Sequence, residues 1–154
     1  QVQAGADIIG LGDSVVSQIS PALYREFSLP YQQRIFAAVK EMGAIPRLHI
    51  CGNTSLILSE MAQSGADIID LDWMVDFARA AALYGGYPVI CGNFDPVAVM
   101  LQGSLEQVEA AVRYGLENGG RRYFSAAGCE IPDFTPVENL AAQRETLSGY
   151  YPAS

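Results

Sequence analysis

The sequence predicts an α/β fold made of consecutive parallel βα units, the arrangement found in (β/α)8 TIM barrels. Short apolar runs of strand length alternate with longer helical segments along the whole chain. No glycine-rich phosphate fingerprint of a dinucleotide-binding fold follows any of these strands. The expected fold is therefore the C-terminal part of a TIM barrel with about five βα units, and a doubly wound sheet is the alternative.

The first βα unit starts with an apolar strand over Ala6 to Leu11. Ser20-Pro21 then begins a helical region, because serine caps helix N-termini and proline is accommodated in the first turn. The region extends to about Met42 and ends at Gly43, with Pro30 as a possible break inside it.

The next two units repeat this order, and small residues that commonly end helices, Ser64-Gly65 and Gly85-Gly86, follow each helix. The predicted elements are a strand over Ile45 to Cys51, a helix from Thr54 to about Gln63, a strand over Ile68 to Asp72 and a helix over Asp76 to Tyr84.

The last two units contain the clearest helix start, since Ser104 is a good N-cap and Gln107 occupies the capping-box position. Gly119-Gly120 ends that helix. The predicted elements are a strand over Pro88 to Cys91, a helix over Ser104 to Asn118, a strand over Tyr123 to Ala126 and a helix from about Pro136 to Leu147.

The composition narrows the possible partners and the cellular compartment. Half of the residues are apolar and the net charge is −8, with Lys and Arg scattered, so nucleic acid and anionic membrane surfaces are not expected partners. No run reaches the roughly 18 apolar residues of a membrane span, and no signal peptide is recognisable. Three cysteines without a secretory signal favour the reducing cytoplasm and thiols kept for metal binding or chemistry.

No linker or low-complexity tract divides the chain, so residues 1–154 are expected to form a single domain. The chain opens at Gln1 inside a pattern typical of a helix that runs into a strand. Five strands do not close a barrel and leave two open sheet edges. We therefore expect a barrel fragment whose missing N-terminal part exists in the parent protein.

The sharpest chemical signal is the pair His49 and Cys51, two residues apart on a strand and thus on the same face. Imidazole and thiolate suit zinc, and Cys129, at another predicted strand end, would supply a second thiolate. Three protein ligands with an open position are typical of a catalytic zinc site. The alternative is a buried cysteine beside a hydrogen-bonded histidine.

Three other residues at strand ends compete for functional roles. Cys91 lies in Val89-Ile90-Cys91-Gly92-Asn93, which echoes the sequence around Cys51, but no histidine precedes it and an inert buried thiol is favoured. Asp70 and Asp72 share one strand face, with Asp72 nearer the barrel mouth. Each of the two is either a solvated carboxylate or a ligand, base or hydrogen-bond acceptor.

Six motifs follow one another along the chain. They are Leu29-Pro30-Tyr31, His49-Ile50-Cys51-Gly52-Asn53, Asp72-Trp73-x-Val75-Asp76, Gly92-Asn93-x-Asp95-Pro96, Gly128-Cys129-Glu130-Ile131-Pro132 and Thr135-Pro136-x-Glu138-Asn139-Leu140. Together they resemble the motifs of the uroporphyrinogen decarboxylase superfamily, in particular its zinc-dependent branch of methylcobalamin:coenzyme M methyltransferases. The resemblance covers nearly the whole chain and implies a barrel of roughly twice this length.

The resemblance implies that His49, Cys51 and Cys129 bind zinc and that Asp72 is a catalytic carboxylate and the exchangeable fourth partner of the metal. The alternative is that Asp72 accepts a hydrogen bond from a backbone amide at the rim or orients the His49 ring without binding the metal. It also implies that Asn93 and Glu130 contact the substrate. The expected reaction moves a methyl group from methylcobalamin on a partner corrinoid protein to a small thiol similar to coenzyme M, or to another acceptor.

The two branches of the superfamily differ at the position of Cys129, where the decarboxylases typically carry a histidine and do not use the His-x-Cys pair. This difference favours the methyltransferase branch. The spellings Asp72-Trp73 and Asn93-Phe94-Asp95-Pro96 resemble decarboxylase-like members, so a carboxy-lyase of that type is one alternative. A non-catalytic barrel fragment is the other, and the fragment alone is expected to be inactive.

Overall fold

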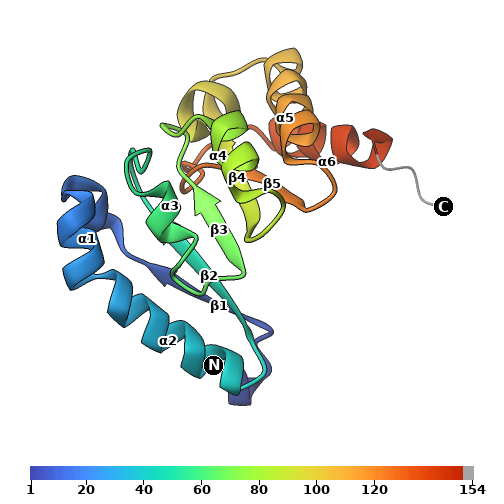
Figure 1. Ribbon diagram of the computed structural model, residues 1–154. Coiled ribbons are helices and arrows are strands. Elements are labelled where there is room, and N and C mark those ends of the chain that lie inside the picture. The colour runs from blue at the N-terminus through green and yellow to red at the C-terminus, as the bar shows by residue number, and fades with distance from the viewer. Residues whose placement is uncertain (151–154) are drawn as a thin grey trace.

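In the computed structural model, which describes residues 1–150, the strands form one parallel sheet (Figure 1). The sheet order is β1-β2-β3-β4-β5, so strands that follow each other in the chain also lie side by side. The strands are β1 (Ile8–Gly12), β2 (Ile45–Ile50), β3 (Ile68–Leu71), β4 (Val89–Phe94) and β5 (Tyr123–Ala127).

Helices connect successive strands, as parallel pairing requires. They are α1 (Pro21–Phe27), α2 (Leu29–Glu41), α3 (Leu58–Met61), α4 (Phe77–Tyr84), α5 (Leu105–Gly119) and α6 (Val137–Tyr150), with short helical segments η1 (Val2–Ala4), η2 (Ser14–Gln18) and η3 (Pro96–Leu101). Within residues 1–150, none of these helices has the length and apolar character needed to cross a bilayer.

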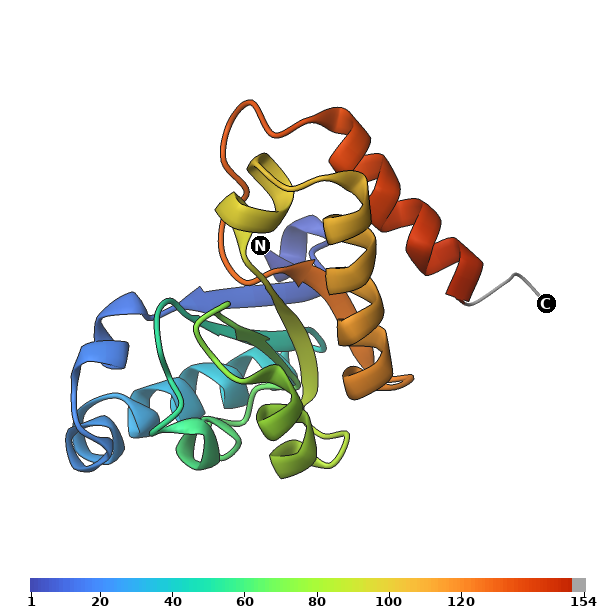
Figure 2. The same ribbon diagram turned by 90° about the horizontal axis from the view of Figure 1, so that it is seen from above.

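The sheet has a helix-covered face and a cavity-lining face. Figures 1 and 2 show α2, α3, α4 and α5 along the same side of the strands. Leu48, Ile50, Ile69 and Leu71 are fully buried in a core that includes residues of α2, α3 and α4, while buried residues of α5 form a second cluster. The residues that alternate with them, among them His49, line a cavity on the other face. Strand periodicity therefore separates core residues from candidate site residues.

The predicted order of strands and helices is confirmed, with three differences in the boundaries. The long helical region divides at Ser28, because the Ser28 hydroxyl donates to the Asp13 carboxylate at 2.6 Å, and Pro30 is accommodated in the first turn of α2. α3 is only four residues long. Before it, the Asn53 side chain accepts a hydrogen bond from the Ser55 amide at 3.1 Å, a turn that competes with helix formation.

The third difference concerns β4, which continues past Cys91 to Phe94. Its last residues stay in the ladder because Gly92, Asn93 and Phe94 pair with Ser125, Ala126 and Ala127 of β5. Cys91 is therefore an interior strand residue, opposite Asp70 in the register, and the predicted position at a strand end was wrong.

Asn139 joins α6 to the rest of the fold. Its side-chain amide donates to the Met100 carbonyl at 2.8 Å and to the Gly103 carbonyl at 3.0 Å, and the residue is buried. This contact explains why asparagine occupies that position of the Thr135-to-Leu140 motif.

We expect Asn139→Ala to lower the free energy of unfolding by about 1–3 kcal/mol, because buried carbonyl groups lose their donor. Urea denaturation of the variant measures this change. Glu138→Ala, at the exposed neighbouring position, is the matched control and should stay within about 0.5 kcal/mol of the unsubstituted protein. Equal midpoints for the two variants would contradict the role of Asn139.

Candidate metal centre

Strand β2 provides two of the predicted ligands. Arg47 and His49 alternate with the buried Leu48 and Ile50, so both side chains face the cavity. Cys51 directly follows the last residue of β2 and continues the same alternation. The strand therefore brings an imidazole and a thiol to one side of its carboxyl end.

Cys129 arrives from the other end of the sheet, on the segment after β5. The preceding Gly128 donates its amide to the Phe94 carbonyl at 2.8 Å and lies against the loop after β3. A Cβ atom on Gly128 would lie 2.2 Å from the Trp73 amide nitrogen, a distance that no side chain tolerates. Glycine is thus required for the close approach that places Cys129 beside β2.

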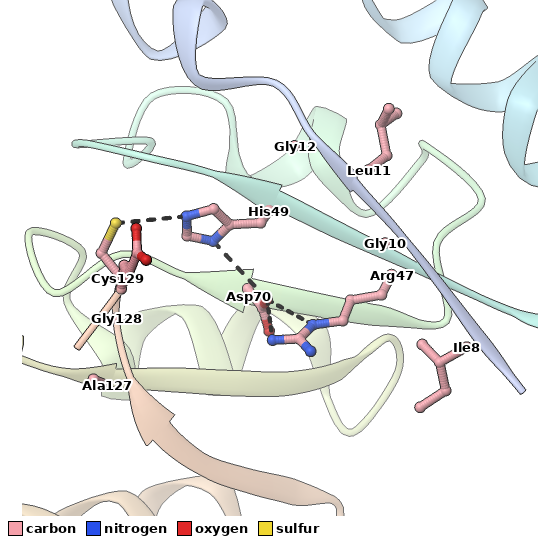
Figure 3. A pocket seen from close by; sticks show the side chains of 11 residues that line it. Ile8, Gly10, Leu11, Gly12, Arg47, His49, Asp70, Ala127, Gly128 and Cys129 are labelled. Carbon is pink, nitrogen blue, oxygen red and sulfur yellow. Dashed lines mark hydrogen bonds and ion pairs between the residues drawn. The ribbon is translucent and has the colours of Figure 1, made fainter. Parts of the chain in front are cut away.

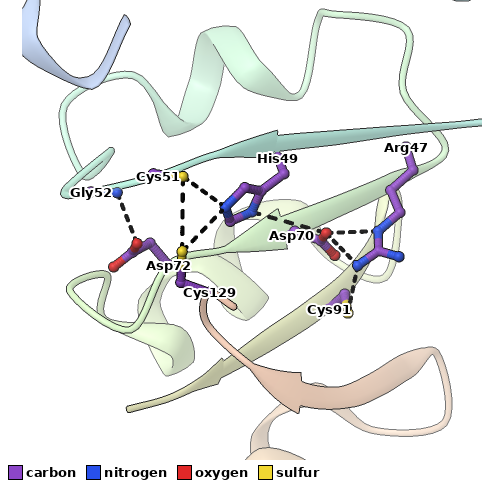
Figure 4. A network of polar contacts seen from close by, with 8 residues as sticks. All are labelled: Arg47, His49, Cys51, Gly52, Asp70, Asp72, Cys91 and Cys129. Carbon is purple, nitrogen blue, oxygen red and sulfur yellow. Dashed lines mark hydrogen bonds and ion pairs between the residues drawn. The ribbon is translucent and has the colours of Figure 1, made fainter. Parts of the chain in front are cut away.

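The structure brings the three predicted ligands together (Figure 4). His49 Nε2 lies 3.1 Å from Cys51 Sγ and 4.0 Å from Cys129 Sγ, and the two sulfur atoms are 3.9 Å apart. A tetrahedral zinc ion with ordinary bond lengths separates two sulfur ligands by about 3.8 Å and a sulfur and a nitrogen ligand by about 3.6 Å. The spacing and the chemistry of the donors therefore fit zinc.

The electrostatics of the cluster explain why it suits a cation. Burial, followed by the hydrogen bond and the charge of Cys129, raises the pKa of the Cys51 thiol. Two thiolates so close together repel each other unless a positive charge lies between them. A metal ion supplies that charge and makes the thiolate form of both cysteines favourable.

Asp72 is buried, and both of its carboxylate oxygens accept backbone hydrogen bonds. Oδ2 accepts from the Gly52 amide at 2.8 Å, and Oδ1 accepts from the Met74 amide at 3.0 Å. The group of close ligand atoms in residues 1–150 contains His49, Cys51 and Cys129 without Asp72. This geometry favours the role of backbone acceptor at the rim.

The two residues expected at the substrate have different surroundings. The Asn93 side-chain amide donates to the carbonyls of Asp72 and Val75, at 3.1 and 2.7 Å, and so fastens the loop after β3 to β4. Glu130 is exposed and lines the same cavity as His49 and Cys129. Only Glu130 therefore faces the cavity beside the cluster.

The cavity in Figure 3 has a volume of about 510 Å³ and lies over β1, β2, β3 and the end of β5. Its floor contains the polar pair Arg47 and Asp70, of which the sequence indicated only Asp70 as a candidate for a functional role. Arg47 Nε donates to Asp70 Oδ2 at 2.7 Å, and the pair lies beside His49. The signal was the alternation Arg47-x-His49-x-Cys51, which places three polar side chains on one face of an otherwise apolar strand.

Cys91 does not join the group of ligand atoms. It is buried below Arg47, whose Nη2 lies 4.0 Å from the sulfur. Burial, followed by the charge of Asp70, raises the pKa of the Cys91 thiol to about 12. The thiol is therefore protonated near neutral pH, as expected of an inert buried cysteine.

The parallel sheet is typical of barrel-type α/β proteins, whose functional residues lie at the carboxyl ends of the strands. Here those ends carry an imidazole and two thiols, so the protein is of the barrel type with a candidate metal site. The chain belongs to the uroporphyrinogen decarboxylase (URO-D) family, whose model matches residues 1–150. The predicted family is confirmed.

The relatives that match the chain include both methyltransferases and decarboxylases. It is 38% identical over 151 residues to the methylcobamide:CoM methyltransferase MtbA of Methanosarcina mazei, covering 97% of this chain and 44% of that protein. It is 36% identical over 148 residues to the uroporphyrinogen decarboxylase of Nostoc punctiforme, covering 95% of this chain and 41% of that one. The chain thus spans less than half the length of these relatives.

The fold also matches a solved structure of a methyltransferase from Methanosarcina mazei. The TM-score is 0.87 at 29% sequence identity, and the match covers 97% of this chain and 44% of the solved one. The expected fold class, part of a TIM barrel, is confirmed.

We expect Gly128→Ala to lower the free energy of unfolding by about 1–3 kcal/mol, because the added methyl group overlaps the backbone of Trp73. Thermal or urea denaturation measures the change. Gly149→Ala is the control, since a Cβ atom there meets nothing within 4 Å and alanine favours the helix. A stability loss in the control that equals the loss at Gly128 would show that the close approach is not the cause.

Peptide mapping after brief labelling with iodoacetamide at pH 8 should find Cys91 modified last in metal-free protein. Cys51 and Cys129 are half-buried, whereas Cys91 is 5% exposed and has a strongly raised pKa. Labelling of Cys91 should accelerate as the pH approaches 12, or when urea unfolds the protein, because only the thiolate reacts. Modification of Cys91 as fast as Cys129 in the native state would contradict this assignment.

Proposed function

We propose that the protein is a zinc-dependent methyltransferase that moves a methyl group from a methylated corrinoid protein to a small thiol. The cluster of His49, Cys51 and Cys129 carries the proposal, because its donor set and spacing fit a zinc ion with an open position. The 38% identity to a methylcobamide:CoM methyltransferase supports the same reaction class.

The residues of the chain have distinct roles in this proposal. His49, Cys51 and Cys129 would hold the metal, while Asp72 fixes the segment that follows Cys51 and Asn93 fastens the loop after β3. The cavity beside them, with Glu130 at its edge, receives the thiol substrate. Zinc, when bound, lowers the pKa of a coordinated thiol so that the substrate is present as a thiolate.

The transfer step balances without an external oxidant or reductant. The substrate sulfur forms a bond to the methyl carbon, and the carbon–cobalt bond of the methylated corrinoid breaks with its electron pair left on cobalt. The products are a thioether and a corrinoid reduced from Co(III) to Co(I). The contribution of this chain is to orient the thiol in the cavity so that its sulfur faces the partner protein at the strand ends.

A carboxy-lyase of the uroporphyrinogen decarboxylase type is the second candidate. The observation that favours it is the 36% identity to a uroporphyrinogen decarboxylase. That reaction assigns no task to two thiols within 3.9 Å of each other, which is why we rank it second.

Metal analysis of the purified full-length protein tests the first proposal. We expect about one zinc ion per chain, and Cys129→Ser should weaken binding strongly because it removes one of the three ligands. Cys91→Ala removes the third thiol of the chain and is the matched control, so it should leave the zinc content unchanged. Full zinc affinity in Cys129→Ser, or zinc loss in Cys91→Ala, would overturn the ligand assignment.

Product analysis separates the two candidate reactions. With the full-length protein, free methylcobalamin and coenzyme M should give a methyl thioether and cob(I)alamin in a zinc-dependent reaction, while uroporphyrinogen should release no carbon dioxide. Zinc-independent decarboxylation of uroporphyrinogen without methyl transfer would establish the second candidate instead.

A further inference from the structure

Asp70 is a buried carboxylate that lies between two cavity-facing side chains of the neighbouring strand (Figure 4). Asp70 is opposite His49 in the register of β2 and β3, and Arg47 precedes His49 by two residues on the same face. The ladder thus places the carboxylate beside both side chains.

Arg47 holds Asp70 from one side. Its Nε donates to Asp70 Oδ2 at 2.7 Å, and its Nη2 contacts the same oxygen at 2.5 Å. Asp70 Oδ1 is buried and has no hydrogen-bond partner within the described part of the chain. The carboxyl group therefore keeps an unused acceptor while Arg47 fixes its position.

His49 faces Asp70 from the other side. Its Nδ1 lies 4.0 Å from Asp70 Oδ2, while its Nε2 points toward the sulfur atoms of Cys51 and Cys129. The ring thus presents one nitrogen to a carboxylate and the other to the candidate metal site.

The carboxylate distinguishes the two neutral forms of the ring. A carboxylate only accepts hydrogen bonds, so a proton on Nδ1 is attracted to Asp70 whereas a lone pair on Nδ1 is repelled. With the proton on Nδ1, the lone pair lies on Nε2 and is directed at the metal site. Metal-binding histidines commonly depend on such an outer partner for their tautomer and orientation.

We propose that Asp70, fixed by Arg47, is a positioning residue that selects the Nδ1–H tautomer of His49 and so directs its Nε2 lone pair at the metal site. The metal part of this inference rests on the proposed function. Asp72, the other buried carboxylate near the cluster, does not compete for the role, because both of its oxygens already accept backbone amides.

Nuclear magnetic resonance of the ring nitrogens tests the tautomer directly. His49 is the only histidine among residues 1–154, and comparison with the spectrum of His49→Gln assigns its ¹⁵N signals in the full-length protein. In metal-free protein, at a pH where the ring is neutral, we expect Nδ1 to carry the proton and Nε2 to be unprotonated. A predominant Nε2–H form in the unsubstituted protein would overturn the proposal.

Asp70→Asn removes the charge and keeps the shape. We expect the Nδ1–H population to fall and the zinc affinity to drop by about 10- to 100-fold, measured by competition with a chelator. The matched control is Asp67→Asn, at the opposite end of β3, where the carboxylate accepts from Lys40 at 2.7 Å. The control should leave both the tautomer and the zinc affinity unchanged.

The readouts separate the failure of this inference from the failure of the proposed function. Unchanged ¹⁵N signals and unchanged zinc affinity in Asp70→Asn would overturn the role of Asp70 even if zinc and methyl transfer are found. If the tautomer behaves as expected but the protein binds no zinc, the positioning of His49 by Asp70 stands and the proposed function fails.

Discussion

The buried carboxylate of Asp72 is the constraint on which the candidate site depends. It accepts the Gly52 amide after β2 and the Met74 amide in its own loop, and its backbone carbonyl accepts a hydrogen bond from Asn93 of β4. The same loop backbone forms the surface against which Gly128 packs. One short segment thereby links the ends of β2, β3, β4 and β5, and the three potential metal ligands meet because those ends are held together.

The chemistry of the cluster of His49, Cys51 and Cys129 follows from the short distance between its two thiols. The two thiols and the imidazole have their ligand atoms within 4.8 Å of one another, and the two thiols cannot both become thiolates without a compensating cation. Burial, followed by the hydrogen bond and the charge of Cys129, raises the pKa of the Cys51 thiol in the metal-free protein. Around the cluster, Arg47 and Asp70 neutralise each other in a row that ends at His49. The site thus consists of the His49, Cys51 and Cys129 cluster and of an ion pair, Arg47 with Asp70, that lies beside His49.

Membership of the URO-D family leaves the reaction to be decided by particular side chains, since the chain is similar to both methyltransferases and decarboxylases. Motifs such as Asp72-Trp73 and Gly92-Asn93 support the scaffold. Asn93 holds the loop after β3, and Gly92 and Asn93 extend β4 along β5. The proposed preference for methyl transfer over decarboxylation rests on the two thiols. Cys51 and Cys129 have no scaffold role in the described hydrogen bonds beyond their contacts with each other and with His49.

The sequence by itself determined the alternation of strands and helices, the caps at Ser20 and Ser104, and the three candidate ligands, because local periodicity and side-chain chemistry carry that information. Boundaries that depend on distant partners were not predictable: β4 continues past Cys91 because β5 pairs with it, and α3 is short because a turn at Asn53 competes with the helix. The role of Asp72 as a clamp and the place of Asp70 between Arg47 and His49 were decided by the register of β2 against β3 and by loop contacts. These are long-range relations between strands, and no local pattern in a single sequence encodes them.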